Sequence, residues 1–272
     1  MNYILMMLSL AVISLSKRFK TMIKELNNCL KEVGIQEEFT SDNIIITSRS
    51  VIIKSDSNIH QLLEDYMYPP IEELEVFHYT SEEAYNNIIN NQQFRLYNIL
   101  KRYGEGELSP FLKKFGFDEA FDTSGNIKNI EFYQNIFYAS FIKVPEDGID
   151  TEEMKYFDKL CETRLKFKIT STKNTFRKIR YSNDEYFTFF LKLKEIINNH
   201  GKKFIIEGMS TRFATFCIDD NNEIENEYRI YWRYWDTKTN GLSVKKDNED
   251  NNYISLDFNM DNFTGIKIEL IE

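Results

Sequence analysis

The stretch from Ile224 to Arg233 restricts the possible fold more than any other part of this 272-residue chain. Its residue types alternate with a period of two, which is the side-chain period of a β-strand. One face holds Ile224, Tyr228, Ile230 and Trp232, and the other holds Glu225, Glu227, Arg229, Tyr231 and Arg233. Because an unpaired buried charge is costly, the charged face must meet water, partner charges or a ligand. Two interpretations stay open, a solvated strand with cross-strand ion pairs or one wall of a cleft.

The overall charge argues against one broad class of function. Non-specific binding to nucleic acid or to an anionic membrane relies on a cationic surface, whereas this chain has a net charge of −9 and a pI near 5.1. The balance reverses once, in a segment that we call the basic band: Lys155, Lys159, Arg164, Lys166, Lys168, Lys173, Arg177, Lys178 and Arg180. Such a band is either a solvated face or a surface that attracts a dinucleotide pyrophosphate or an RNA backbone.

The cysteines indicate the compartment and the absence of a metal site. Cys29, Cys161 and Cys217 lie far apart without a C-x-x-C pair, so we expect neither a disulfide framework nor a zinc site. A reducing compartment fits best, and we expect the protein to be cytoplasmic.

The N-terminal residues 1–16 form an apolar run that resembles a signal peptide, but Lys17 and Arg18 follow the run and no basic residue precedes it. The run is shorter than the ~20 residues of a spanning helix, so no membrane span is expected. One interpretation is a retained apolar helix or a segment that binds a partner such as an antitoxin or chaperone. The alternative is a cleaved signal, which would make the protein secreted.

The first 73 residues are predicted to form an N-terminal extension or subdomain, and residues 74–272 the main domain. Apolar positions recur at helical spacing from Lys17 to Val33, and Gly34 ends that helix. Two short β-branched runs between Asn43 and Lys54 predict a hairpin or strand pair. A further helix around residues 59–67 ends at Pro69-Pro70.

His78 lies in a position that suits a binding site. The segment from Glu75 to Thr80 is predicted to be a short strand, and a helix follows it with Thr80 or Ser81 as its N-cap. Side chains at the end of a strand project from a rigid scaffold, often into a cleft. The alternative is that His78 only bonds to the neighbouring turn.

The remaining segments predict a mixed α+β fold. Residues 136–142 form a buried strand that contains Ser140, and no G-x-S-x-G surrounds this serine, so it is not expected to be a hydrolase nucleophile. A helix is predicted at residues 185–198. Further strands are predicted at residues 94–96, 165–170, 204–206, 253–258 and 266–271.

These segments, in this order, resemble the ADP-ribosyltransferase superfamily. The most similar form is a bacterial group with an H-Y-T-S opening, a central S-F strand and an E-x-E-x-R strand. Here these motifs are His78 to Ser81, Ser140-Phe141 and Glu225 to Arg229. The resemblance covers roughly residues 74–272, each motif is short, and the specificity lies in their order and strand context. It implies two packed, mostly antiparallel sheets with flanking helices and a cleft between the sheets for nicotinamide adenine dinucleotide (NAD).

The resemblance also implies roles for single residues. Glu227 would be the catalytic glutamate, and Glu225 would orient or deprotonate the incoming acceptor. The residues that would contact NAD, the substrate, are His78, Tyr79, Thr80, Ser140 and Arg229, with His78 at the ribose or carboxamide and Ser140 supporting the nicotinamide ribose. The middle motif lacks the Ser-Thr-Ser form, and His78 stands where arginine-modifying members carry Arg, so the acceptor stays open.

Three functions are therefore in competition. The first is a mono-ADP-ribosyltransferase, acting as an intracellular toxin or phage-defence effector on nucleic acid, with RNA favoured by the basic band, or on a protein. The second is a metal-independent ribonuclease that uses His78 and Glu227 as acid and base. The third is a non-catalytic member of the fold that binds a partner.

Overall fold

The computed structural model describes residues 18–101, 108–117, 120–128, 130–181, 183–206, 213–218, 226–233, 242–260 and 265–271. The chain divides into two compact units. The first consists of Met1–Met67 together with Asn183–Met209, and the second consists of Tyr68–Ser182 together with Ser210–Glu272. Each unit therefore contains two separate stretches of sequence. Whether residues 1–73 and 74–272 act as separate functional parts stays a prediction.

The first unit packs helices with a small sheet. Its helices are residues 18–32, α2 (Asn58–Met67) and α6 (Tyr186–Asn199), and its strands are β1 (Ile44–Ile46), β2 (Ser50–Ile53) and β9 (Lys203–Ile206). The pair β1–β2 is the antiparallel hairpin that the sequence predicts, and β9 joins β2 in parallel. The ring of Phe190 on α6 lies 5.2 Å from that of Phe204 on β9, which fixes this helix on the sheet.

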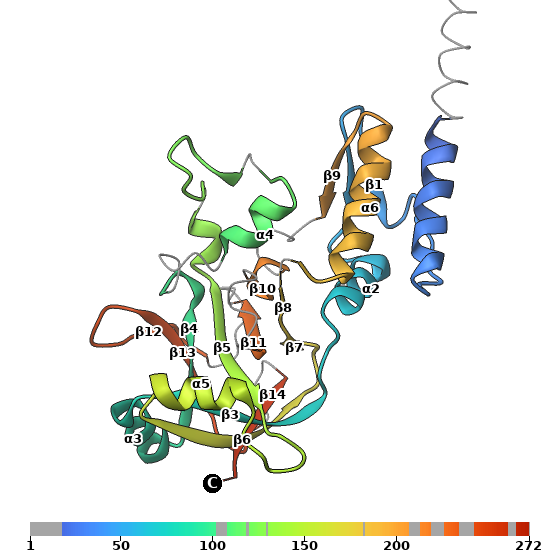
Figure 1. The fold of residues 1–272 in the computed structure, drawn as a ribbon. Helices are drawn as coiled ribbons and strands as arrows, with labels where there is room; N and C mark the ends of the chain where they lie inside the picture. Colours follow the sequence, from blue (N-terminus) through green and yellow to red (C-terminus); the bar gives the residue numbers. More distant parts are fainter. Residues whose placement is uncertain are drawn as a thin grey trace, which may run out of the picture. The chain divides into compact units, whose positions relative to one another are not determined.

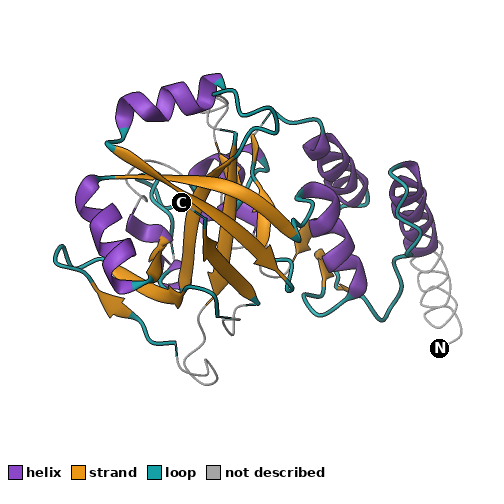
Figure 2. Cartoon of the chain, turned by 90° about the horizontal axis from the view of Figure 1, so that it is seen from below, coloured by secondary structure: helices purple, strands orange, loops and turns teal. Residues whose placement is uncertain are grey.

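The second unit is built on one antiparallel sheet of nine strands, counted over the described ranges. These strands are β3 (Glu73–Thr80), β4 (Gln93–Asn98), β5 (Ile136–Lys143), β6 (Thr163–Ser171), β7 (Phe176–Lys178), β11 (Glu227–Arg233), β12 (Lys245–Lys246), β13 (Asn252–Asp257) and β14 (Ile266–Leu270). Figure 2 shows the long strands of this sheet curling like half a barrel. The predicted α+β class and the antiparallel pairing are confirmed.

The sheet forks at β5. One edge of β5 is covered by β11 along its length, from the Glu227–Ile142 pair to the Arg233–Ile136 pair. The other edge is shared, because β4 pairs only with Phe137 and Tyr138 while β3 pairs only with Ile142 and Lys143. The two strands then diverge, β3 toward β6 and β14 and β4 toward β13 and β12 (Figure 1). Within the described residues, no strand pairs with positions 139–141 at this second edge.

Short helices accompany the sheet. The helix α3 (Glu82–Asn91) begins where predicted, with Ser81 as the N-cap and its hydroxyl accepting from the Ala84 amide at 3.2 Å. The helix α5 (Glu152–Leu160) was not predicted; Thr151 caps it. The unit also contains α4 (Ser109–Lys114), the 3₁₀ helix η3 (Ile130–Tyr133) and a parallel pair of β8 (Arg180–Tyr181) and β10 (Cys217–Ile218). None of the helices in the described ranges has the length and apolarity to cross a bilayer.

Both faces of β11 are buried. Tyr228 and Ile230 belong to the main hydrophobic cluster, which includes Phe94, Phe141 and Phe167, so the predicted apolar face is confirmed. On the other face Glu227 and Arg229 are only 4% and 1% exposed. The interpretation of this face as a solvated strand is therefore wrong for these two residues. Instead, the two side chains form an ion pair with each other, which is described below.

Candidate functional site

A cavity of about 850 Å³ in the second unit is lined by residues of the fork in the sheet. Its walls come from β3, β4, β5, α3, the C-terminal end of α5 and the β12–β13 hairpin. Five of the predicted site residues line it: His78, Tyr79, Thr80, Ser140 and Glu227. Its volume falls within the ~300–1,000 Å³ that is usual for small-molecule sites. The fork thus explains why residues that are distant in the sequence meet, because β3 and β4 separate over the middle of β5.

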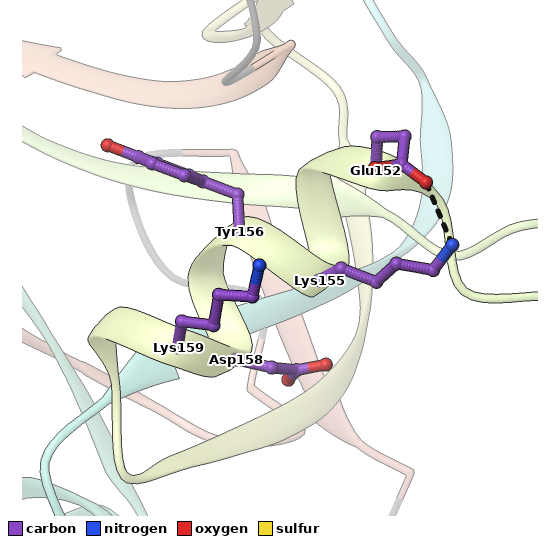
Figure 3. Close-up of a pocket in the computed structure, with 5 residues that line it drawn as sticks. All are labelled: Glu152, Lys155, Tyr156, Asp158 and Lys159. Atoms are coloured by element: carbon purple, nitrogen blue, oxygen red, sulfur yellow. Dashed lines mark hydrogen bonds and ion pairs between the residues drawn. The ribbon is translucent and has the colours of Figure 1, made fainter.

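A second hollow of about 420 Å³ lies over α5 alone. Figure 3 shows that its five residues, Glu152, Lys155, Tyr156, Asp158 and Lys159, all come from that one helix. Glu152 and Lys155 form an exposed ion pair at 2.8 Å. A hollow without a second wall cannot enclose a substrate, so we place the candidate site in the larger cavity.

His78 is held in one orientation at the fork. Its Nδ1 lies 3.1 Å from the backbone carbonyl of Ser140. Because a carbonyl oxygen only accepts, this bond requires the proton on Nδ1. The imidazole also packs between the rings of Phe94 and Phe141, with centroid distances of 4.8 and 5.6 Å. The Nδ1 atom of His78 is therefore bonded to the middle strand, β5. The sequence also left open a bond to the turn beside His78, and this Nδ1 bond is not of that kind.

Ser140 lines the cavity at the middle of β5. Its hydroxyl oxygen is buried and has no hydrogen-bond partner within the part of the chain that the structure describes. The amide and carbonyl of one residue in an antiparallel strand point to the same edge, so the Ser140 N–H faces the fork together with the carbonyl that His78 meets. No strand pairs with positions 139–141 at this edge within the described residues, which makes the Ser140 amide a candidate contact for a bound ligand.

Glu227 and Arg229 form a buried ion pair. The Nε and Nη2 atoms of Arg229 donate to Oε2 of Glu227 at 3.1 and 3.0 Å, and Nη1 donates to the Thr215 carbonyl at 2.8 Å. The guanidinium also lies 4.9 Å from the ring centre of Tyr138. Both of its bonds to Glu227 use one carboxylate oxygen, so the pair fixes the orientation of a carboxylate that lines the cavity. Arg229, which the resemblance assigns to NAD binding, does not line the cavity itself.

The position of Glu225 lies outside the described residues. The spacing that would place it beside Glu227 assumes an extended chain, but Asn226 has a left-handed φ of 39° and β11 begins only at Glu227. The strand alternation thus applies from Glu227 onward. The role of Glu225 stays a prediction.

An aromatic pair forms the wall beside α5. The ring of Tyr79 stacks on Phe157 with centroids 5.3 Å apart, and Nη1 of Arg164 donates to the Tyr79 hydroxyl at 3.3 Å. Burial raises the pKa of Tyr79, and the bond from Arg164 opposes this only in part. The phenol thus stays neutral and serves as a ring surface. The acidic helix start at Thr151, Glu152 and Glu153 is the sequence signal that predicts α5 and hence Phe157.

Two cationic side chains lie over the rings of tyrosines that line the cavity. The Arg95 guanidinium lies 4.4 Å from the ring centre of Tyr253, and the Lys101 ammonium lies 4.0 Å from that of Tyr97. Sequence reasoning missed these residues as site residues, although the alternation of β4 places Gln93, Arg95 and Tyr97 on one face. They place two positive charges at the cavity.

The basic band is largely neutralised. On β6, Lys166 pairs with Glu75 and Lys168 with Glu73, each at 2.8 Å, and Arg164 lies 3.5 Å from both Asp150 and Asp158. Arg177 is fully buried and donates to the carbonyls of Asn174 and Tyr68. With Lys155, which pairs with Glu152 on α5, four of the nine cations thus have carboxylate partners and a fifth, Arg177, is buried.

Among the described residues, no group of three or more histidine, cysteine, aspartate or glutamate side chains is arranged to hold a metal ion. The apolar segment of residues 1–16 lies outside the described part of the chain. No protein-family model, no curated protein and no solved structure matches this chain.

Proposed function

We propose that the protein is an NAD-dependent mono-ADP-ribosyltransferase. The observation that carries this proposal is that one cavity is lined by a strand-end histidine, a serine with an unsatisfied hydroxyl and a carboxylate fixed by a buried arginine, namely His78, Ser140 and Glu227. The finer fold assignment, an ADP-ribosyltransferase-like core, belongs to the same proposal. The fork at β5 supports it by opening a cleft in the sheet.

The residues present fit the dinucleotide. The nicotinamide carboxamide carries a donor and an acceptor, and the fork offers its acceptor the Ser140 backbone amide. Rings at both ends of the cavity, Tyr79 with Phe157 and Tyr97 with Tyr253, supply stacking surfaces for planar bases. Arg95 and Lys101 supply positive charge for the pyrophosphate.

The main requirement for transfer of ADP-ribose from NAD is a carboxylate that is held next to the nicotinamide ribose. The bond between nicotinamide nitrogen and ribose C1′ breaks with its electron pair leaving on nicotinamide, and the ribose becomes an oxocarbenium-like cation. Glu227 stabilises that cation by holding the ribose 2′-hydroxyl and by its charge in a site of low dielectric. The acceptor nucleophile then bonds to C1′ and loses a proton. Glu225 is proposed to take that proton.

The acceptor is proposed to be a nucleic acid, with RNA favoured, or a protein, in the setting of an intracellular toxin or phage-defence effector. Because the basic band is largely paired, Arg95 and Lys101 at the cavity are the better candidates for meeting an acceptor phosphate. An antitoxin or chaperone is proposed as the partner of residues 1–16.

The test is incubation of the purified protein with radiolabelled NAD and separate pools of RNA, DNA and protein, with nicotinamide release measured in parallel. We expect nicotinamide release and label in one pool. If RNA is cleaved without NAD, the protein is a ribonuclease. If NAD is neither bound nor consumed, the cavity serves a binding function and the transferase assignment is wrong.

Cys161 provides a second check on occupancy, because it lines the cavity while Cys29 and Cys217 are buried. Burial raises the pKa of Cys29 to about 11, so this thiol stays protonated and unreactive at neutral pH. We expect one fast-reacting thiol in the native protein, lost in Cys161→Ser, and an NAD-dependent decrease of its alkylation rate. An alkylation rate that saturating NAD leaves unchanged would place the dinucleotide elsewhere.

A further inference from the structure

The turn that leads into β11 is held from two sides. Asn226 has a φ of 39°, in the left-handed region that asparagine tolerates better than most residues. Its backbone amide donates to the Tyr181 hydroxyl at 2.6 Å, and its side-chain amide donates to Oε1 of Glu153 at 3.3 Å. The next residue is Glu227, whose backbone carbonyl accepts from the Ile179 amide at 3.1 Å. These bonds thus fix the backbone at Asn226 and Glu227, from which the Glu227 side chain extends.

Glu153 belongs to α5, the helix that also contributes Phe157 to the cavity wall. Burial raises the pKa of Glu153, but hydrogen bonds from Thr151 and Asn226 outweigh burial and lower the pKa overall. Glu153 is therefore a carboxylate at neutral pH and accepts from the asparagine amide at 3.3 Å. One bond joins a wall of the cavity to the residue that precedes Glu227.

We propose that Asn226 is a positioning residue for Glu227, and that Glu153 and Tyr181 hold it in place. This inference rests on the proposed function, because Glu227 is the proposed catalytic carboxylate. Asn226 fixes the backbone from which the Glu227 side chain extends, while Arg229 fixes the carboxylate end. Both ends of a short side chain are thereby held, which limits its movement against the ribose.

The test reverses the polarity of one hydrogen bond. Asn226→Asp keeps a residue that tolerates the left-handed region but sets two carboxylates against each other, so we expect kcat to fall about 10- to 100-fold with KM for NAD unchanged. Glu153→Gln keeps an accepting oxygen and is expected to retain activity. The double variant restores the bond with donor and acceptor exchanged and has the same net charge as the unsubstituted protein, so we expect kcat to recover.

Two results would overturn the inference. One is an unchanged kcat in Asn226→Asp. The other is a double variant that stays as impaired as Asn226→Asp, since the introduced carboxylate would then act by its charge and not by the position of the turn. Tyr181→Phe, which removes the acceptor of the Asn226 amide, gives an independent second variant with the same expected loss of kcat.

A structural measurement separates this inference from the proposed function. Hydrogen exchange of the peptide that covers residues 226–230 should accelerate in Asn226→Asp and return toward the original rate in the double variant. If the unsubstituted protein releases no nicotinamide, the transferase proposal fails, while the exchange rates still decide whether the bond between Asn226 and Glu153 holds the turn. If this peptide exchanges at the same rate in all variants and in the unsubstituted protein, Asn226 has no positioning role.

Discussion

Replacing Glu227 by glutamine is expected to lower nicotinamide release about 10²- to 10³-fold. The substitution keeps the size of the side chain but removes the negative charge that stabilises the oxocarbenium-like ribose. It also weakens the two bonds from Arg229, which join a guanidinium to a carboxylate. We therefore expect some loss of stability as well, about 1.5–3 kcal/mol. The measurement is release of labelled nicotinamide under saturating NAD.

Glu227→Asp is the matched control for this experiment. It keeps the charge but shortens the side chain by one methylene, so the carboxylate cannot meet Arg229 and the ribose equally well. We expect activity between that of the unsubstituted protein and that of Glu227→Gln. A glutamine variant with full activity would contradict the catalytic role, whatever the aspartate variant does.

Arg229→Met is expected to destabilise the second unit by about 3–5 kcal/mol. The change leaves the Glu227 carboxylate, which is 4% exposed, without its guanidinium, and leaves the Thr215 carbonyl without this donor. Both tryptophans, Trp232 and Trp235, belong to the second unit, so tryptophan fluorescence in urea reports on that unit alone. We expect a lower urea midpoint than for Lys128→Met, which removes an exposed cation of the same unit.

The double variant Glu227→Gln/Arg229→Met separates stability from chemistry. A neutral pair of similar shape often replaces a buried ion pair at little cost, so we expect most of the stability lost in Arg229→Met to return. Activity should stay low because the carboxylate is absent. A double variant that is less stable than Arg229→Met would show that the charge pair is not the source of the loss.

Local patterns predicted much of the fold and several residues of the candidate site. The period-two alternation of β11 and the cap at Ser81 each depend on a few adjacent residues; the cap appears where the sequence places it, and the alternation holds from Glu227 onward. His78 could be chosen from its place at the end of a strand, whereas Ser140 was chosen only through the resemblance to ADP-ribosyltransferases. The missed helix α5 also carries a local signal, the cap and acidic first turn at Thr151 to Glu153.

The fork and the left-handed turn could not be predicted in the same way. The pairing of β3 with β6 joins Thr80 to Thr163, and no local pattern encodes which strand takes which edge of β5. The burial of Glu227 and Arg229 also depends on segments that are distant in the sequence, since Arg229 meets the Thr215 carbonyl and the Tyr138 ring, so a charged strand face looked equally suited to solvent. The bonds of Asn226 to Tyr181 and Glu153 likewise connect elements that are distant in sequence.

The parallel pair of β2 and β9 has a consequence for biosynthesis. Ser50 and Lys203 are neighbours in this sheet, and about 150 residues separate them in the chain. At ~5–20 residues per second, β9 leaves the ribosome roughly 10–30 s after β2. During this interval β2 exposes a strand edge that β9 later covers, and the second unit cannot be completed either, because its Ser210–Glu272 part follows β9 in the chain. A truncated product that ends near residue 73 lacks β9 and is expected to aggregate or be degraded.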